Sequence, residues 1–188
     1  EETGQLDNTI ILFMSDHGET LGDHGLIQKG CRFYEGLVRV PMIWSWQGHF
    51  SEDVRGQGLV ELTDIIPTLL DIIGLDIPDY MVGKSLLSIL TGEASPDVHR
   101  DYVRCEYIDA LDLPDASAAT MYFDGRYKLS VYHSHNLGEL YDLEDDPDEF
   151  NNLWDSPDHQ SIKLDLLQQS FNATMETMYR GLARRGPM

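Results

Sequence analysis

The stretch that decides the fold is Thr9-Ile-Ile-Leu-Phe-Met-Ser-Asp-His-Gly-Glu19. Its first part, residues 9–15, is an apolar run that lacks the polar alternation of a half-exposed strand. Such a run is typical of a central strand in a parallel sheet, which is buried on both faces. Asp16 and His17 follow where this strand ends, and open α/β sheets bind their ligands at that edge.

Two further elements extend the first third of the chain. Residues 38–46 predict a second strand, with Pro41 near its start or at an edge, because proline donates no ladder hydrogen bond. Residues 62–73 have apolar side chains at helical spacing and are followed by Gly74, so they predict a helix. Two strands cannot bury both faces of a parallel sheet, so we expect more strands upstream and interpret the chain as the C-terminal part of a larger α/β protein. The alternative is a complete small domain in which the two runs pair antiparallel.

The second half of the chain predicts a small α+β subdomain of about four antiparallel strands and one C-terminal helix. Asp124-Gly125 suits a type I′ hairpin turn between two of the strands. The helix is expected over residues 161–184, and its buried stripe is expected to be Leu164, Leu167, Phe171, Met175, Met178 and Leu182. The strands are expected at residues 102–107, 119–123, 127–132 and 139–143. We therefore predict two parts, residues 1–98 and residues 99–188.

The charge balance excludes several classes of partner. Lys and Arg number 13 and Asp and Glu number 33, which gives a net charge of −20. A binder of nucleic acid or of anionic lipid needs a basic surface, so neither is an expected partner. No apolar run approaches the roughly 20 residues of a membrane span. The soluble protein's location, whether periplasmic, secreted or cytoplasmic, stays open.

The loop after the first strand concentrates polar groups around several glycines. Asp16 and His17 together can supply two ligands to a divalent cation, and Lys29 can neutralise an anionic group held against that metal. The competing interpretation is that Asp16 caps the next turn and that His17 forms a local hydrogen bond. His24 and Arg32 either line a substrate site or pair with neighbouring carboxylates.

A second acidic region, residues 139–158, does not fit a calcium-binding loop. Pro147 stands where the EF-hand template requires glycine, and Leu153 stands where it requires a bidentate glutamate. We expect a solvated loop that ends a strand and caps the final helix.

The order of motifs in the loop resembles the C-terminal signature of type I sulfatases, of the alkaline-phosphatase-like superfamily. The resemblance continues through residues 62–71, 83–86 and 139–153. It implies that residues 1–98 are the C-terminal part of an alkaline-phosphatase-like α/β sandwich, followed by the small subdomain. The motifs that carry it are Ser15-Asp-His-Gly-Glu19, Leu21-Gly-Asp-His-Gly-Leu26, Lys29, Tyr34-Glu35 and Arg39-Val-Pro41.

The resemblance also implies a sulfuric ester hydrolase. Asp16 and His17 match ligands of a calcium-type cation, for which Mg²⁺, Mn²⁺ or Zn²⁺ are further candidates, and Lys29 matches the catalytic lysine that contacts the sulfate. The implied substrate is a sulfate ester, for instance of a carbohydrate. The family's nucleophile is a formylglycine made within a C/S-x-P/A-x-R motif, which this sequence lacks. We therefore expect the missing N-terminal part to supply the nucleophile, and we expect the chain alone to be inactive.

Two alternatives accompany this interpretation. A phosphodiesterase or phosphonate monoester hydrolase of the same superfamily would use a similar metal and lysine, because sulfate and phosphate are both tetrahedral oxyanions. A non-catalytic module that binds metal or glycan is the alternative from a different functional class.

Overall fold

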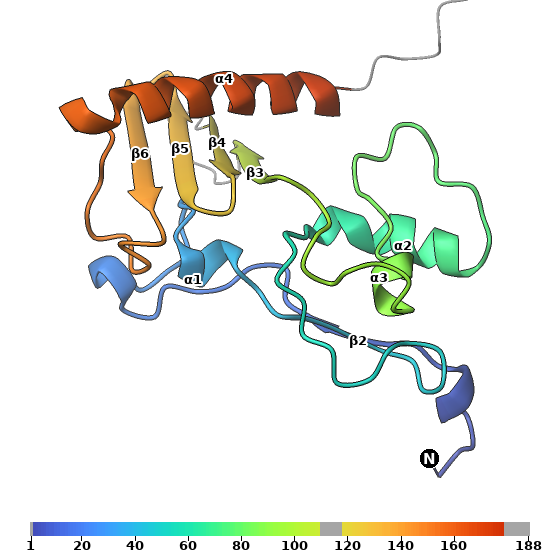
Figure 1. Cartoon of the computed structure of the whole chain (residues 1–188). Helices are drawn as coiled ribbons and strands as arrows, with labels where there is room; N and C mark the ends of the chain where they lie inside the picture. The colour runs from blue at the N-terminus through green and yellow to red at the C-terminus, as the bar shows by residue number, and fades with distance from the viewer. Residues whose placement is uncertain (1, 110–117, 179–188) are drawn as a thin grey trace, which may run out of the picture.

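The computed structural model describes residues 2–109 and 118–178, which form two sheets. A two-stranded hairpin lies on one side, and a four-stranded antiparallel sheet in the order β3-β4-β5-β6 lies on the other (Figure 1). The strands are β1 (Ile11–Met14), β2 (Met42–Ser45), β3 (Val103–Ile108), β4 (Ala118–Phe123), β5 (Tyr127–His133) and β6 (Leu137–Asp142). The larger sheet confirms the antiparallel subdomain that the sequence predicts.

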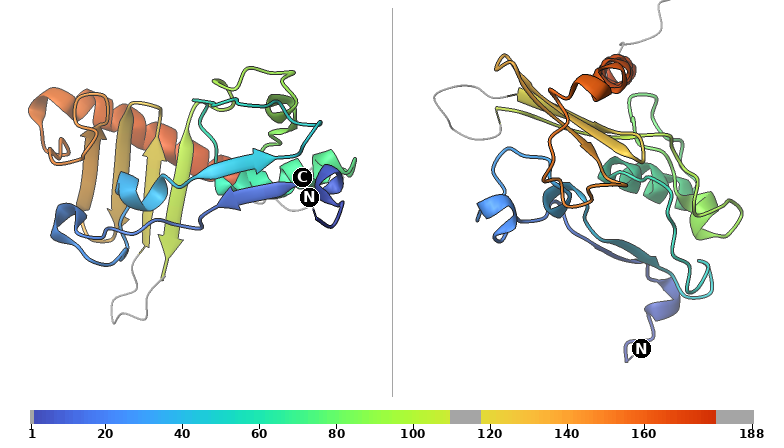
Figure 2. Two further views of the ribbon diagram at one scale, coloured as in Figure 1. Left: turned by 90° about the horizontal axis from the view of Figure 1, so that it is seen from below. Right: turned by 60° about the vertical axis from the view of Figure 1, so that its left-hand side comes forward.

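Four α-helices accompany the sheets in the part of the chain that the structure describes. The longest, α4, crosses one face of the larger sheet, and α1 lies near the other side of that sheet (Figure 1). Two further helices lie beside the hairpin, away from the larger sheet (Figure 2). The helices are α1 (Glu35–Val38), α2 (Ile65–Ile72), α3 (Leu87–Leu90) and α4 (Gln160–Thr177), with 3₁₀ turns at Leu6–Asn8, Asp23–Gly25, Leu62–Asp64 and Pro157–His159. Among the described residues, no helix is long and apolar enough to cross a membrane.

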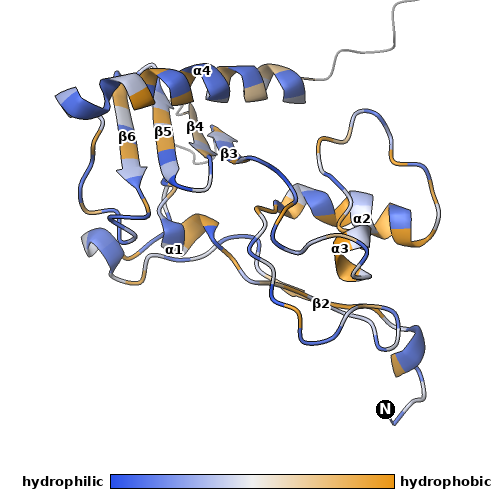
Figure 3. Ribbon diagram, in the orientation of Figure 1, coloured by the Kyte–Doolittle hydropathy of each residue, from blue (hydrophilic) through white to orange (hydrophobic). Residues whose placement is uncertain are grey.

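The first apolar run differs from its expected environment. β1 pairs antiparallel with β2, with Phe13 opposite Ile43, and the side chains of both residues are more than half exposed. The two runs thus pair antiparallel with each other, as in the alternative, whereas the covering strands that we expect upstream lie outside this chain and stay a prediction. Hydrophobic residues lie along the hairpin and on α2 (Figure 3). No described residue covers the outward apolar side chains of β1 and β2. The apolar run therefore forms a strand, but its side chains are not buried within the described residues.

The turn between β4 and β5 confirms the expected hairpin but not its turn type. Gly125 has a φ of +100°, whereas Asp124 is not among the residues with positive φ, and a type I′ turn requires both. The Asp124 carboxylate instead accepts hydrogen bonds from the backbone N–H groups of Arg126 and Tyr127, at 2.9 and 2.7 Å. The turn is thus held by a side chain that replaces a backbone partner.

The helix α4 buries a different face from the expected one. Leu166, Ser170 and Ala173 are buried, and Leu166 and Ala173 pack with residues of β4, β5 and β6. Small side chains bring the helix close to the sheet, and the Tyr122 hydroxyl donates to the Gln169 side chain at 2.8 Å. Four members of the expected buried stripe are instead exposed: Leu164 (69 %), Phe171 (65 %), Met175 (44 %) and Met178 (57 %).

The extent of α4 is also shorter than expected. Within the described residues the helix ends at Thr177, because Met178 is extended, and the expected end at residue 184 lies outside those residues. Leu167 is partly buried against the sheet and agrees with the expected stripe. Leu182 and the expected stop at Gly186-Pro187 lie outside the described residues.

The predicted helix over residues 62–73 forms as a 3₁₀ turn that continues into α2. The carboxylate of Asp64 is fully buried, accepts the backbone N–H groups of Glu61 and Lys84, and pairs with Arg100. The side chain of Arg100 also pairs with Glu61 at 2.8 Å. Because Arg100 lies just before β3, this ion cluster fixes the start of α2 against the segment that leads into the larger sheet.

A buried ammonium group lies between the larger sheet and α1. The Lys128 side chain on β5 is 1 % exposed and pairs with Glu35, at 2.9 Å, and with Glu149. The second oxygen of Glu149 accepts the backbone N–H of Glu35 at 2.6 Å. Burial raises the pKa of Glu149, and Lys128 opposes that shift. These contacts join three segments that are far apart in the sequence.

The acidic region is therefore not simply a solvated loop. Glu149 and Asp142 are buried, and the Arg126 guanidinium binds both oxygens of Asp142 and holds the pKa of that carboxyl below its usual value. The expectation that the region caps α4 is also wrong, because the residue before the helix, His159, makes no side-chain cap. Several of these acidic side chains instead anchor the loop to the sheet.

Replacing Lys128 by methionine should destabilise the protein by about 3–5 kcal/mol, because it leaves two carboxylates without their buried partner. Urea unfolding followed by tryptophan fluorescence measures the change. The matched control is Lys84→Met, at an exposed side chain, which should change stability by less than about 0.5 kcal/mol. Equal stability of the two variants would refute the structural role given to Lys128.

Candidate active site

The loop that follows β1 is closed by a direct contact between its two ends. The backbone N–H of Gly18 donates to the carbonyl of Leu37 at 2.8 Å. A Cβ atom added to Gly18 would lie 1.9 Å from the carbonyl oxygen of Gly36, so glycine is required here by the close approach of two backbones. The residues between them form one closed excursion from the end of β1 to α1.

Asp16 and His17 lie at the start of this excursion and share local hydrogen bonds. The His17 backbone N–H donates to Asp16 Oδ1 at 3.0 Å, and the His17 ring nitrogen Nδ1 lies 2.8 Å from the carbonyl oxygen of Gly18. A carbonyl can only accept, so Nδ1 has the proton and Nε2 keeps its lone pair. The local hydrogen bond of the competing interpretation is thus present, and it also orients Nε2 for a cation.

Lys29 reaches back across the excursion to the same point. Its Nζ lies 2.5 Å from His17 Nε2, and Asp16 Oδ2 lies 3.7 Å from the same nitrogen. The structure therefore brings together the three residues that the sequence assigns to metal and sulfate. Asp16 is 83 % exposed and His17 is 44 % exposed at their side chains, so the group is open to solvent.

The donor set provides two ligands for a divalent cation when Lys29 Nζ, which lies 2.5 Å from His17 Nε2, moves off that nitrogen. A carboxylate oxygen and an imidazole lone pair converge within a few ångströms, with the second ring nitrogen bonded to a carbonyl, as is usual for a metal-binding histidine. Within residues 2–109 and 118–178, no group of three or more His, Cys, Asp or Glu side chains converges to hold a metal ion. Asp16 and His17 would therefore supply part of a coordination shell.

His24 and Arg32, the expected substrate residues, lie in different surroundings from Lys29. The His24 ring stacks on Tyr34, with centroids 3.8 Å apart, and the Arg32 guanidinium lies 5.8 Å from the centroid of the Tyr132 ring. Both side chains thus contact aromatic rings, and neither forms an ion pair with a neighbouring carboxylate among the described residues.

The stack of His24 on Tyr34 forms one wall of a pocket of about 410 Å³. Sequence reasoning missed the rest of the lining, because it comes from the acidic region, more than a hundred residues later. Tyr34 and Glu35 belong to a family motif, which did not assign them to a pocket, and no local sequence pattern indicates a role for Phe150. The lining residues are Asp23, His24, Tyr34, Glu35, Gly36, Pro147, Asp148, Glu149 and Phe150.

Residues 22–176 match the family model described as N-sulphoglucosamine sulphohydrolase, C-terminal. Among curated proteins, an arylsulfatase of Clostridium perfringens is 34 % identical over 184 residues, which are 96 % of this chain and 36 % of the relative. The match thus covers both the excursion that holds Lys29 and the larger sheet.

Solved structures give the same alignment at the level of the fold. The structure of BT4656 in complex with its substrate D-glucosamine-2-N,6-O-disulfate matches 94 % of this chain and 36 % of its own, with 27 % identity and a TM-score of 0.83. The phosphonate monoester hydrolase SpPMH of Silicibacter pomeroyi matches 97 % of this chain and 38 % of its own, with 29 % identity and a TM-score of 0.85. The chain spans about a third of the length of the relatives that it matches.

The Gly18→Ala substitution should open the closed excursion and destabilise the protein by about 1–3 kcal/mol, because the added methyl group overlaps the Gly36 carbonyl. The free energy of unfolding in urea measures the loss, and the NMR signals of the His17 ring should shift. In the control variant Gly36→Ala, the new methyl group meets chiefly the flexible end of the Asp23 side chain at 3.1 Å. Similar losses in both variants would contradict the close-approach argument.

Proposed function

Because the chain belongs to the type I sulfatase family, of which it forms the C-terminal region, we propose that it supplies metal- and sulfate-binding residues to a sulfuric ester hydrolase. The observation that carries the proposal is the convergence of Asp16, His17 and Lys29 at the end of β1. These three side chains come from both halves of one loop, and each contributes the type of group that an oxyanion site with a cation needs.

Each residue has a distinct role in the proposal. Asp16 and His17 would hold a divalent cation, with Ca²⁺ or Mg²⁺ favoured by the carboxylate and Mn²⁺ or Zn²⁺ by the imidazole. The cation, when bound, would polarise a sulfate oxygen. Lys29 donates hydrogen bonds to the remaining oxygens and stabilises the charge that develops on them as the ester bond breaks. Its ammonium is exposed, so it can reach a bound oxyanion without first losing a buried partner.

The nucleophile of the proposed reaction would come from outside this chain. The sequence has no C/S-x-P/A-x-R motif, and the matching relatives extend well beyond the region that this chain covers. The chain therefore contributes binding and charge stabilisation, whereas the bond-forming group belongs to the remainder of the enzyme.

A sulfated amino sugar is the substrate class that the comparisons favour. The matched family model and the BT4656 complex both concern sulfated glucosamine. The second candidate function is hydrolysis of phosphonate monoesters, which is supported by the TM-score of 0.85 to SpPMH. Both activities would use the same three side chains, and parallel assays with a sulfate ester and a phosphonate ester distinguish them.

In the full-length enzyme, Asp16→Ala should abolish activity together with bound metal, because it removes one of the two ligands that this chain supplies. The Lys29→Ala variant should keep the metal and lower kcat by about 10²–10³-fold, the usual cost of removing one charge-stabilising donor. Metal content by atomic emission and turnover of an aryl sulfate give the two readouts. Loss of metal in both variants would show that the two roles are assigned wrongly.

The isolated 188-residue chain should show no catalytic turnover. Incubation with an aryl sulfate and each candidate cation, with product measured over several hours, checks this. The full-length enzyme under the same conditions is the positive control, and multiple turnovers by the chain alone would contradict the division of roles.

A further inference from the structure

We propose that the four-stranded sheet is a positioning platform for Lys29, and that Tyr107 and Glu139 are its positioning residues. The inference rests on the proposed role of Lys29, and it assigns a task to the subdomain beyond the role of the loop itself. It follows from the way in which the segment between Lys29 and α1 is attached.

The attachment begins two residues after Lys29. The hydroxyl of Tyr107, on β3, donates to the carbonyl of Cys31 at 3.1 Å. Burial raises the pKa of Tyr107 to about 12, so this hydroxyl keeps its proton and remains a donor at neutral pH. The next residue, Arg32, places its guanidinium over the ring of Tyr132 on β5.

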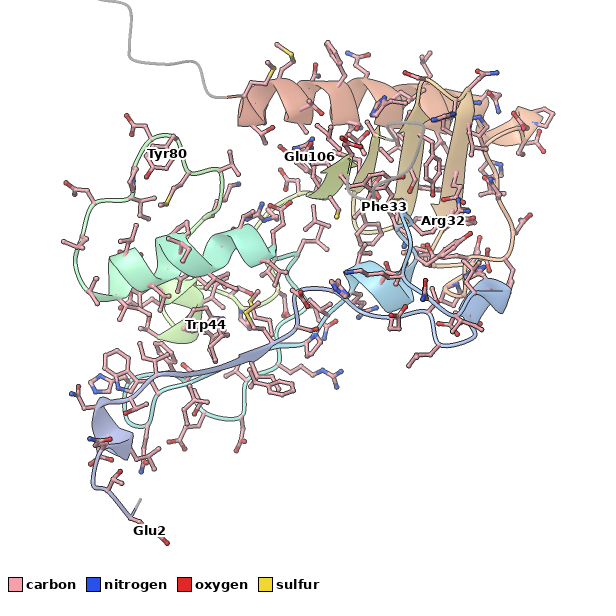
Figure 4. All side chains as sticks on the ribbon, turned by 180° about the vertical axis from the view of Figure 1, so that it is seen from behind. Glu2, Arg32, Phe33, Trp44, Tyr80 and Glu106 are labelled. Carbon is pink, nitrogen blue, oxygen red and sulfur yellow. The ribbon has the colours of Figure 1, made fainter. Side chains whose placement is uncertain are left out.

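Phe33 provides the apolar part of the attachment. Its side chain is 3 % exposed and packs in a cluster with Ala119 and Met121 of β4 and with Tyr132 of β5. The Phe33 ring also lies 5.5 Å from the ring of Tyr107. Arg32 and Phe33 lie next to the strands, on the segment that leads into α1 (Figure 4).

Glu139, on β6, completes the attachment. Its carboxylate accepts the hydroxyl of Tyr132 at 2.9 Å and the hydroxyl of Tyr34 at 3.4 Å. Four consecutive residues, 31–34, are thus held by side chains from all four strands of the sheet. These contacts fix the backbone of a segment that lies in no helix or strand.

The attachment acts on Lys29 through a single intervening residue. Gly30 has a φ of +54° and is the only residue between Lys29 and the first attached residue. The sheet therefore fixes the backbone on one side of Lys29, while the side chain reaches His17 on the other. A misplaced ammonium would lose stabilisation of the transition state even though the lysine is present.

The test is a double-mutant cycle in the full-length enzyme with an aryl sulfate as substrate. Tyr107→Phe keeps the ring and removes only the hydroxyl, so it should lower kcat by about three- to tenfold, the value of one hydrogen bond, with little change in KM. In a Lys29→Ala background the same substitution should have no further effect on kcat, because there is no ammonium left to position. Glu139→Gln should behave in the same way.

The matched control is Tyr102→Phe. The Tyr102 hydroxyl donates to Glu176 of α4 at 3.1 Å, and its ring stacks on Tyr122 in the cluster under α4, so the variant loses an equivalent hydrogen bond on the opposite face. It should leave kcat unchanged, and thermal unfolding should show that both tyrosine variants remain folded.

The outcomes distinguish the positioning role of the sheet from the proposed role of Lys29. If Tyr107→Phe lowers kcat equally with and without Lys29, its role is structural and the positioning proposal is overturned. An unchanged kcat in Tyr107→Phe overturns it as well. If Lys29→Ala alone leaves kcat unchanged, the proposed function fails first, and the cycle then identifies that failure rather than the failure of the platform.

Discussion

The arrangement of the chain depends on one buried positive charge. The Lys128 ammonium lies in the interior, where water cannot solvate it, and a charge in such surroundings must be paired. Of its two partners, Glu35 begins α1 and Glu149 lies within the acidic region. Because α1 follows directly after the segment docked on the sheet, the ion cluster also fixes one end of the excursion that presents Lys29. The buried pairs of Lys128 with Glu35 and Glu149 thus help to determine where the exposed Lys29 lies.

Local patterns in the sequence predicted the larger sheet well. Alternating strands and an Asp-Gly turn are signals that neighbouring residues generate themselves, and all four strands formed within two residues of the expected bounds. The prediction of the buried face of α4 was wrong because apolar residues occur on both sides of the helix. The side that packs on the sheet includes Ser170 and Ala173, whose small side chains do not form a recognisable hydrophobic stripe. The run at β1 formed a strand as predicted, but its apolar side chains remain exposed within the described residues, because the strands expected to cover them are not part of this chain.

The candidate site divides in the same way. Asp16 and His17 adjoin in the sequence, and Lys29 follows within the same glycine-rich loop, so their grouping could be predicted from motif order. The groups that hold the loop could not. Tyr107 lies 76 residues from its partner Cys31, and Glu139 lies 105 residues from Tyr34. A tyrosine or glutamate within a strand has no local signature that indicates such a distant contact.

The attachment of residues 31–34 to the larger sheet has a consequence for biosynthesis. The bond between Glu35 and Glu149 spans 114 residues, which a ribosome adds in roughly 6 to 23 s. For most of that interval, the segment beyond Lys29 has no complete sheet on which to dock, because β3 begins at Val103 and β6 ends only at Asp142. The loop that carries Lys29 therefore becomes ordered late, after the final strands have been synthesised and paired.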